Sequence, residues 1–376
     1  MTGRFQKNIH PGVAAVLVLA VLVAVQGVWW RGLVTRPPSK PAGFAGGGAL
    51  KIPPPQVNIL GRSDVQVETY AGDQEPGDSD GPGHEARFDR PTGLAVDVQG
   101  NLYIADTGNH RIRKISPDGL TATLAGGDEG FTDGPADRAR FQAPCGICVA
   151  PDGALYVADT GNGAVRRIQN GLVVTIARYT PNLAAQPPSG LHPLAQPSGI
   201  AYVAGDPPFL LVADAGDKRL HKLGLNGTLE AETNLAGPPT AVVGTPQTAA
   251  AIPQTGLLLI GNQSLHNLPV EGADMPNPEL QPLLRHPVGL WPMGRDWLVT
   301  DSDYGALFMF HEGKAGVLAG HCSSAGPMRA FKDGDGAHAN FSILSGVVTD
   351  GKKFIYVADT ANNSIRRLTL PEAISR

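Results

Sequence analysis

Apolar residues between positions 88 and 115 fall into short runs separated by turn residues. One run follows a Pro-x-Gly motif, a second ends at Ala105-Asp106, and polar and apolar residues alternate along 111–115 (RIRKI). Runs of this length, and alternation with a period of two, are typical of strands bounded by turns. The segment therefore predicts three antiparallel strands.

The same pattern returns five more times along the chain. The copies are close at 141–168 and 341–368, and weaker in the units that start at Pro197, Pro239 and Pro287. Self-similarity of this kind marks a repeat architecture, and units of four short antiparallel strands are typical of β-propeller blades. We therefore expect an all-β protein with six blades.

The fourth strand of each blade suggests how the ring closes. Residues 121–126 (TATLAG) and 315–320 (AGVLAG) follow the third strands of their units, whereas the last unit ends near Leu370 without such a strand. Residues 65–72 (VQVETYAG) match these outer strands. They are predicted to pair with the last unit, which would join both ends of the propeller and leave no open edge.

These repeats closely resemble the NHL repeat family. The resemblance covers about residues 65–370, and it is weakest in the fourth unit, where Gly261 replaces the strand-end aspartate and Pro269 falls within the third strand. It implies a six-bladed β-propeller of NHL type with an irregular fourth blade.

An uncharged apolar run precedes the repeats at residues 12–30 and ends in Trp29 and Trp30. As a helix, its 19 residues would span about 28 Å, close to the hydrocarbon thickness of a bilayer. One N-terminal transmembrane helix is therefore part of the predicted fold class. The aromatic pair fits the membrane interface.

The predicted domains follow from this division. Residues 1–31 are expected to be an anchor or a signal segment, 32–62 a Pro/Gly-rich tether, and 63–376 the propeller closed by 65–72. The predicted location is a membrane with a single pass. Basic residues flank both ends of the apolar run and do not fix its orientation, and the extracytoplasmic or luminal side is the preferred expectation for the propeller.

Charge argues against nucleic acid as a partner. Residues 1–63 contain seven basic and no acidic residues, which leaves 23 basic and 34 acidic residues in the remainder. Binding to phosphate backbones needs a basic footprint. The basic pairs of the third strands are expected to lie on solvated strand faces, with some ion pairs between blades; they are Arg111/Arg113, Arg166/Arg167, Lys218/Arg219 and Arg366/Arg367.

Two further motifs have structural interpretations. Cys145 and Cys148 have CxxC spacing, but in a strand they point to opposite faces, too far apart for a disulfide, so neither a redox nor a metal role is expected. A second motif, Asp-Gly followed six residues later by Ala-x-Phe with the same spacing each time, begins at Asp80, Asp133 and Asp333. It predicts a turn and a Phe packed between blades.

The most catalytic-looking residues are aspartates that recur at the end of the second strand. A catalytic group is normally needed once, whereas a group that stabilises a turn is needed in every blade. We therefore assign a structural role to the whole set: Asp106, Asp159, Asp214, Asp301 and Asp359.

Propeller active sites usually lie at the axis, at the mouths of the first strands. The residues expected there form a small and nearly neutral ring: Thr92, Cys145, Ser198, Thr240, Val288 and Ser345. These types do not make an acid–base pair, a nucleophile–base pair or a metal site. No catalytic residues, cofactor or metal are therefore predicted.

The sequence favours a membrane-anchored, non-enzymatic propeller that binds proteins as a scaffold or as an accessory subunit of a membrane complex. The alternative is a small-ligand sensor, or a metal-dependent enzyme like the propeller lactonases and lyases. The expected partners are proteins at a membrane, and the bilayer itself through residues 12–30.

Overall fold

The computed structural model describes the propeller repeats as strands joined by turns and short 3-10 segments. The described residues are 64–178, 194–235, 237–244, 248–253, 258–261, 286–294, 296–311, 314–320 and 330–371.

Three antiparallel sheets arise from the repeats that resemble one another most. In order from the inner strand outward, the first contains β3 (Pro91–Val96), β4 (Leu102–Asp106), β5 (Arg111–Ile115), β6 (Leu120–Gly126) and the short β2 (Gly81–Pro82). The second contains β8 (Pro144–Val149), β9 (Leu155–Asp159), β10 (Ala164–Gln169), β11 (Leu172–Arg178) and β7 (Gly134–Pro135). The last contains β24 (Leu344–Thr349), β25 (Phe354–Asp359), β26 (Ser364–Thr369), β1 (Gln66–Gly72) and β23 (Gly334–Asp335).

The weaker repeats form the other sheets of the described chain. The third sheet contains β12 (Pro197–Val203), β13 (Phe209–Asp214), β14 (Arg219–Gly224) and β15 (Leu229–Asn234). The next contains β16 (Pro239–Gly244), β17 (Thr248–Pro253) and β18 (Leu258–Gly261). The fifth contains β19 (Pro287–Met293), β20 (Asp296–Asp301), β21 (Ala306–His311) and β22 (Lys314–Gly320).

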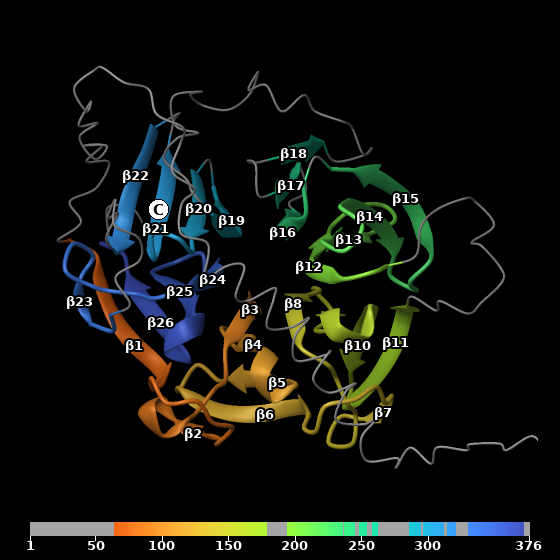
Figure 1. Ribbon diagram of the computed structural model, residues 1–376, viewed down its shortest axis with the longest axis horizontal. Helices are drawn as coiled ribbons and strands as arrows, with labels where there is room; N and C mark the ends of the chain where they lie inside the picture. Colours follow the sequence, from red (N-terminus) through yellow and green to blue (C-terminus); the bar gives the residue numbers. More distant parts are fainter. Residues whose placement is uncertain are drawn as a thin grey trace, which may run out of the picture. The chain divides into compact units, whose positions relative to one another are not determined.

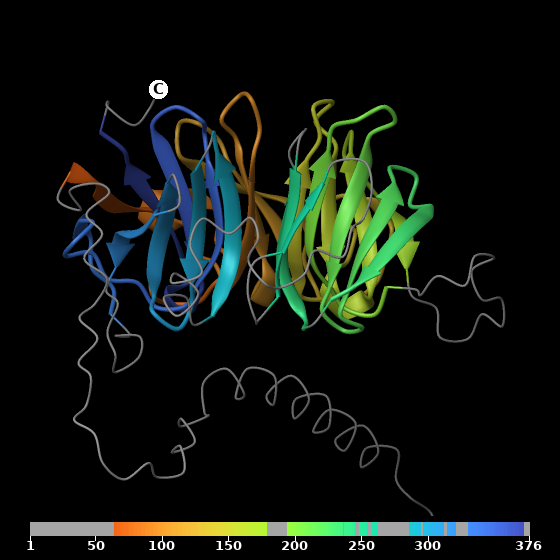
Figure 2. The same cartoon turned by 90° about the horizontal axis from the view of Figure 1, so that it is seen from above.

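The sheets stand around a common axis. Their innermost strands contact one another in the cyclic order β3, β8, β12, β16, β19, β24 and back to β3 (Figure 1). In the view of Figure 2 the strands run between the two faces of this ring. Apolar clusters fill the spaces between neighbouring sheets, so the core is divided among the seams of the ring.

The prediction of six four-stranded blades is wrong for the described residues. Five sheets have four or more strands and are complete blades, whereas the sheet of β16–β18 has three. Leu258–Gly261, expected to be the second strand of its unit, is the third, because β17 pairs between it and β16. This unit also has Gly261 in place of the strand-end aspartate of the other units.

The predicted fold class also included a transmembrane helix, and this part of the prediction needs correction. Among the described residues, no helix has the length and apolar character needed to cross a membrane. Residues 12–30, and with them the predicted domains 1–31 and 32–62, lie outside the described residues. The observed class is an all-β propeller with five complete blades.

The N-terminal strand β1 closes the ring from the outside of the last sheet. It pairs antiparallel with β26 from Gln66 opposite Thr369 to Gly72 opposite Ser364, with one irregularity. This is the pairing expected from the likeness of 65–72 to the other outer strands. Both ends of the repeat region therefore share one sheet.

The Gly of the Pro-x-Gly motif lets the inner strands approach one another. A Cβ placed on Gly93 in β3 would lie 2.1 Å from the carbonyl oxygen of Cys145 in β8. A Cβ on Gly289 in β19 would lie equally close, 2.1 Å, to the carbonyl oxygen of Ser345 in β24. Only a residue without a side chain fits these two contacts.

Candidate functional site

The strand-end aspartates anchor the beginning of the inner strand of their own sheet. The Asp106 carboxylate accepts the backbone N–H of Asp89, two residues before β3, at 2.9 Å. The same bond, between 2.7 and 3.0 Å long, joins Gln142 to Asp159, Gln196 to Asp214, His286 to Asp301 and Ser342 to Asp359. These five carboxylates therefore recur because every complete blade needs this anchor.

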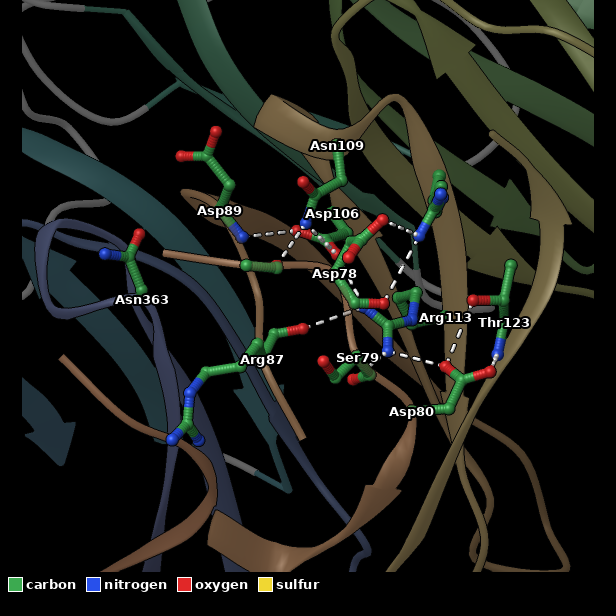
Figure 3. A network of polar contacts seen from close by, with 12 residues as sticks. Asp78, Ser79, Asp80, Arg87, Asp89, Asp106, Asn109, Arg113, Thr123 and Asn363 are labelled. Atoms are coloured by element: carbon green, nitrogen blue, oxygen red, sulfur yellow. Dashed lines mark hydrogen bonds and ion pairs between the residues drawn. The ribbon is translucent and has the colours of Figure 1, made fainter. Parts of the chain in front are cut away.

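In three blades the aspartate also binds a buried arginine seven residues later. Arg113 Nη1 donates to Asp106 Oδ2 at 2.9 Å, and Arg113 Nη2 donates to Asp80 Oδ1 at 2.6 Å (Figure 3). The guanidinium also bonds the carbonyls of Ser79 and Arg87 and lies over the Phe88 ring. Asp80 in turn accepts from the backbone and hydroxyl of Thr123 in β6. The cluster therefore ties the linker to two strands of the blade.

The same arrangement recurs in the second and last blades. We call each of these sets an arginine cluster: Asp106, Arg113, Asp80 and Phe88; Asp159, Arg166, Asp133 and Phe141; and Asp359, Arg366, Asp333 and Phe341. In the last blade the threonine is Thr69 of β1, so this cluster also clamps the closing strand.

Burial governs the protonation of these carboxyl groups. It raises the pKa of Asp106 to about 6 against the opposing effect of Asn109, the backbone and Arg113. It also raises the pKa of Asp159 and of Asp359. Because their oxygens are bonded inside the fold, these groups are poorly placed to bind or protonate a ligand.

The interpretation of the basic pairs needs correction. Arg113, Arg166 and Arg366 are fully buried instead of lying on solvated strand faces. The seven-residue spacing from Asp to Arg was visible in the sequence and could have indicated these ion pairs. Burial also removes these three cations from any surface that could meet nucleic acid.

Hydroxyl groups near the axis are used to join neighbouring sheets. Each donates to a carbonyl of the next inner strand: Thr107 to Pro144, Thr160 to Pro197, Ser198 to Pro239, Thr240 to Pro287, Thr300 to Ser345 and Thr360 to Pro91, at 2.6 to 3.3 Å. These bonds run around the ring in the order of the sheets.

The six predicted mouth residues lie on these inner strands. Thr92 Oγ1 bonds Thr107 Oγ1 at 2.6 Å and the Cys145 carbonyl at 3.2 Å, and Ser345 Oγ bonds Thr360 Oγ1 at 2.5 Å. Cys145 and Val288 are partly exposed side chains of β8 and β19. The structure thus places the six residues on the inner strands, where their hydroxyl groups take part in the hydrogen bonds at the contacts between sheets.

Both described cysteines carry free thiols. Burial raises the pKa of Cys145, and it raises that of Cys148 to about 12. A raised thiol pKa keeps the thiol protonated and unreactive at neutral pH. Both residues lie in β8, and their chemistry is that of structural thiols.

Alkylation should therefore be slow in the folded protein. In a Cys322→Ser variant at about pH 8, the Cys148 thiolate fraction should be more than about a thousandfold below that of an ordinary cysteine. Iodoacetamide labelling followed by mass spectrometry should give slow modification in the native protein and fast modification in urea. Equal rates in both conditions would show that Cys148 is an accessible, activated thiol.

One group of metal-binding side chains is compact enough to hold an ion within the described part of the chain. It consists of Asp214, Asp217 and His221, whose ligand atoms lie within 4.8 Å of one another. The sequence did not predict it, because Asp214 was assigned a structural role and neither Asp217 nor His221 belongs to a metal-binding motif. The available signal was the His at position 221, where the strongly matching blades have arginine.

Comparison with known proteins identifies the family to which the repeats belong. A family model described as the NHL repeat matches residues 88–115 and 141–168, the first two repeats. The chain is an NHL-repeat protein. The two matched segments span β3–β5 and most of β8–β10 of the NHL propeller, together with the first two buried arginines. The predicted number of six repeats is not confirmed by this match.

The NHL region is similar to parts of much larger proteins. It is 39% identical over 94 residues to Protein SUPPRESSOR OF QUENCHING 1, chloroplastic, of Arabidopsis thaliana, which covers 24% of the chain and 9% of that relative. It is 39% identical over 95 residues to NHL repeat-containing protein 2 of Homo sapiens, covering 24% of the chain and 13% of that relative. The chain thus spans only a small part of the curated relatives it matches.

A solved structure from Bacteroides thetaiotaomicron, a protein of unknown function, has the same fold. The TM-score is 0.60 at 14% sequence identity, and the match covers 81% of the NHL chain and 76% of that structure. At this identity the likeness extends to the fold alone.

Proposed function

We propose that this NHL propeller is a non-enzymatic module that binds a protein partner with its outer surface. The observation that supports the proposal is that polar groups near the axis already form hydrogen bonds within the propeller. The hydroxyls of the mouth bond neighbouring strands, and the repeated carboxylates bond backbone N–H groups and buried arginines. Groups engaged in this way maintain a rigid ring, which suits the presentation of a fixed binding surface.

Exposed apolar side chains supply a candidate contact region. Among the described residues, the large hydrophobic side chains that lie exposed are Val98, Leu120 and Leu172, and Val98 is 91% exposed. Val98 lies in the turn between β3 and β4, and Leu120 begins β6 after the turn from β5. Since antiparallel strands alternate in direction, both turns are at the same end of the first blade. Leu172 begins β11 at the corresponding end of the second blade.

A location at a membrane belongs to the same proposal. Its basis is the uncharged apolar run at residues 12–30. Alkaline carbonate extraction of cells that make the full chain tests it directly. Retention in the membrane pellet supports the location, and release into the supernatant opposes it.

The partner is tested by affinity purification of the full chain in mild detergent with quantitative mass spectrometry. A Val98→Glu/Leu120→Glu variant should lose the partner by at least tenfold, since charge in an apolar contact is costly. A Thr92→Val/Ser198→Ala variant, altered at the axis, should keep it. Loss of the partner in the axial variant, with recovery in the surface variant, would instead favour the alternative of a ligand-binding or enzymatic axis.

A further inference from the structure

The third blade differs from the arginine-cluster blades at two positions that face its strand-end aspartate. In the first blade, Asp106 is followed by Asn109 three residues later and by Arg113 seven residues later, and both side chains donate hydrogen bonds to it. In the third blade, Asp214 is followed at the same spacings by Asp217 and His221. A neutral donor and a cation are thus replaced by a carboxylate and an imidazole.

The imidazole lies among carboxylates without bonding them. His221 is fully buried, and its Nε2 is 3.8 Å from Asp214 Oδ2 and 3.7 Å from Asp217 Oδ1. These separations exceed hydrogen-bonding distance, and both ring nitrogens of His221 and Oδ1 of Asp217 have no hydrogen-bond partner. A buried polar atom without a partner is destabilising, because it has lost its hydrogen bonds to water. Asp214 Oδ2 accepts the backbone N–H of Ala195 at 2.5 Å. Two of the atoms without a partner, His221 Nε2 and Asp217 Oδ1, face each other and can each offer an electron pair to a cation.

We propose that a divalent transition-metal ion, best fitted by Zn²⁺, binds Asp214, Asp217 and His221 in the place of the guanidinium. The three ligand atoms lie within 4.8 Å of one another. Two ligand atoms on a tetrahedral zinc ion with bonds of about 2.1 Å are about 3.4 Å apart. The observed 3.7 and 3.8 Å separations need to shorten by only a few tenths of an ångström. One imidazole with two carboxylates is a donor set that zinc accepts.

The surroundings of the three ligands resemble an outer shell of a metal site. Glu232 in β15 faces Nδ1 of His221 at 3.7 Å, on the side of the ring away from Asp214 and Asp217. A carboxylate that accepts the other ring N–H orients a ligating histidine and raises its basicity, and Glu232 would have to approach by several tenths of an ångström to do so. Arg219 bonds the other Asp217 oxygen at 2.8 Å, which fixes Asp217 but also places a positive charge nearby. The bound ion would tie β13, β14 and the turn between them.

The fifth blade has neither the arginine of the arginine clusters nor the aspartate and histidine that follow Asp214 in the third blade. There the residue seven positions after Asp301 is the buried Phe308, and Asp301 accepts the backbone N–H groups of Asp303 and Tyr304 in its own turn. An apolar residue is therefore tolerated at this position. Since the fold accepts Tyr304 and Phe308 at these two positions of the fifth blade, it does not require Asp217 and His221 there, which favours a role in binding an ion.

Zinc added to the purified, EDTA-stripped full chain tests the site. After gel filtration, elemental analysis should find one zinc per chain, and zinc should raise the Tm by about 5 °C if the ion is present at about a hundred times its Kd. A His221→Arg/Asp217→Asn variant, which restores the residues of the first blade, should hold no zinc and show no zinc-dependent Tm. A His338→Ala variant, which removes an exposed histidine paired with Asp335, should behave like the parent.

The single variant Asp217→Asn provides a second measurement if the double variant does not fold, because it removes a ligand at nearly constant volume. It should lower zinc affinity at least tenfold. The proposal is overturned if the parent retains no zinc, or if the Asp217→Asn variant and the parent retain the same amount.

Discussion

Replacing Arg166 by methionine is expected to lower the free energy of unfolding by about 3–5 kcal/mol, as is usual when one partner of a buried ion pair is removed. Arg166 is fully buried and bonds Asp159 at 2.8 Å and Asp133 at 2.7 Å. Without the guanidinium, the buried Asp159 carboxylate keeps its charge without a cation or must take up a proton. Urea denaturation followed by circular dichroism measures the loss.

Arg140→Met is the matched control. Arg140 forms an ion pair with Asp128 at 3.2 Å, and both side chains are well exposed. Exposed pairs contribute about 0–1 kcal/mol, so this variant should differ little from the parent. Adding Asp159→Asn to Arg166→Met should recover part of the stability, because the unpaired charge is then removed. Similar losses for Arg166→Met and Arg140→Met would refute the structural role of the arginine clusters.

Gly93→Ala is expected to destabilise the ring by about 3 kcal/mol, the cost of overpacking a tight contact. The added Cβ would stand 2.1 Å from the Cys145 carbonyl oxygen, so the inner strands β3 and β8 would have to separate. That separation would also lengthen the bond from Thr92 Oγ1 to the same carbonyl, now 3.2 Å. The thermal midpoint and the urea midpoint should both fall.

Gly127→Ala separates this steric effect from the general effect of replacing glycine. A Cβ on Gly127 would meet nothing within 4 Å, and its backbone does not adopt the left-handed conformation. This variant should be as stable as the parent or slightly more so, because alanine restricts the unfolded chain. If Gly93→Ala were equally well tolerated, the inner strands would not be in the close contact described.

The sequence predicted those features of the fold that repeat. Alternation along 111–115 and the strand-end aspartates located the strands of the strong repeats, and the likeness of 65–72 to 121–126 identified the closing strand. The prediction for the fourth unit was wrong because its sequence pattern is weak. Strand β17 has no counterpart in the repeat motif, and the LLIG run was assigned one strand too early. Pattern matching fails where the residues that define the pattern are missing.

The arginine clusters and the proposed metal site were harder to predict because their contacts join residues that are far apart in the sequence. Arg113 and Asp80 are 33 residues apart, and an arginine in an alternating strand is equally compatible with solvent or with a buried ion pair. The burial of His221 likewise depends on which face of β14 turns inward. The recurrence of Asp and Arg seven residues apart was the one local signal, and its change to Asp and His at 214 and 221 marks the proposed metal site.

Site-specific photocrosslinking in cells tests the central claim, that the propeller binds a partner with its surface and not at its axis. A photoreactive residue at position 120, where Leu120 is half exposed, should give one discrete protein adduct. The same residue at position 92, on the inner strand β3, should give none. An adduct formed at position 92 but not at position 120 would contradict the account and place the binding site at the axis.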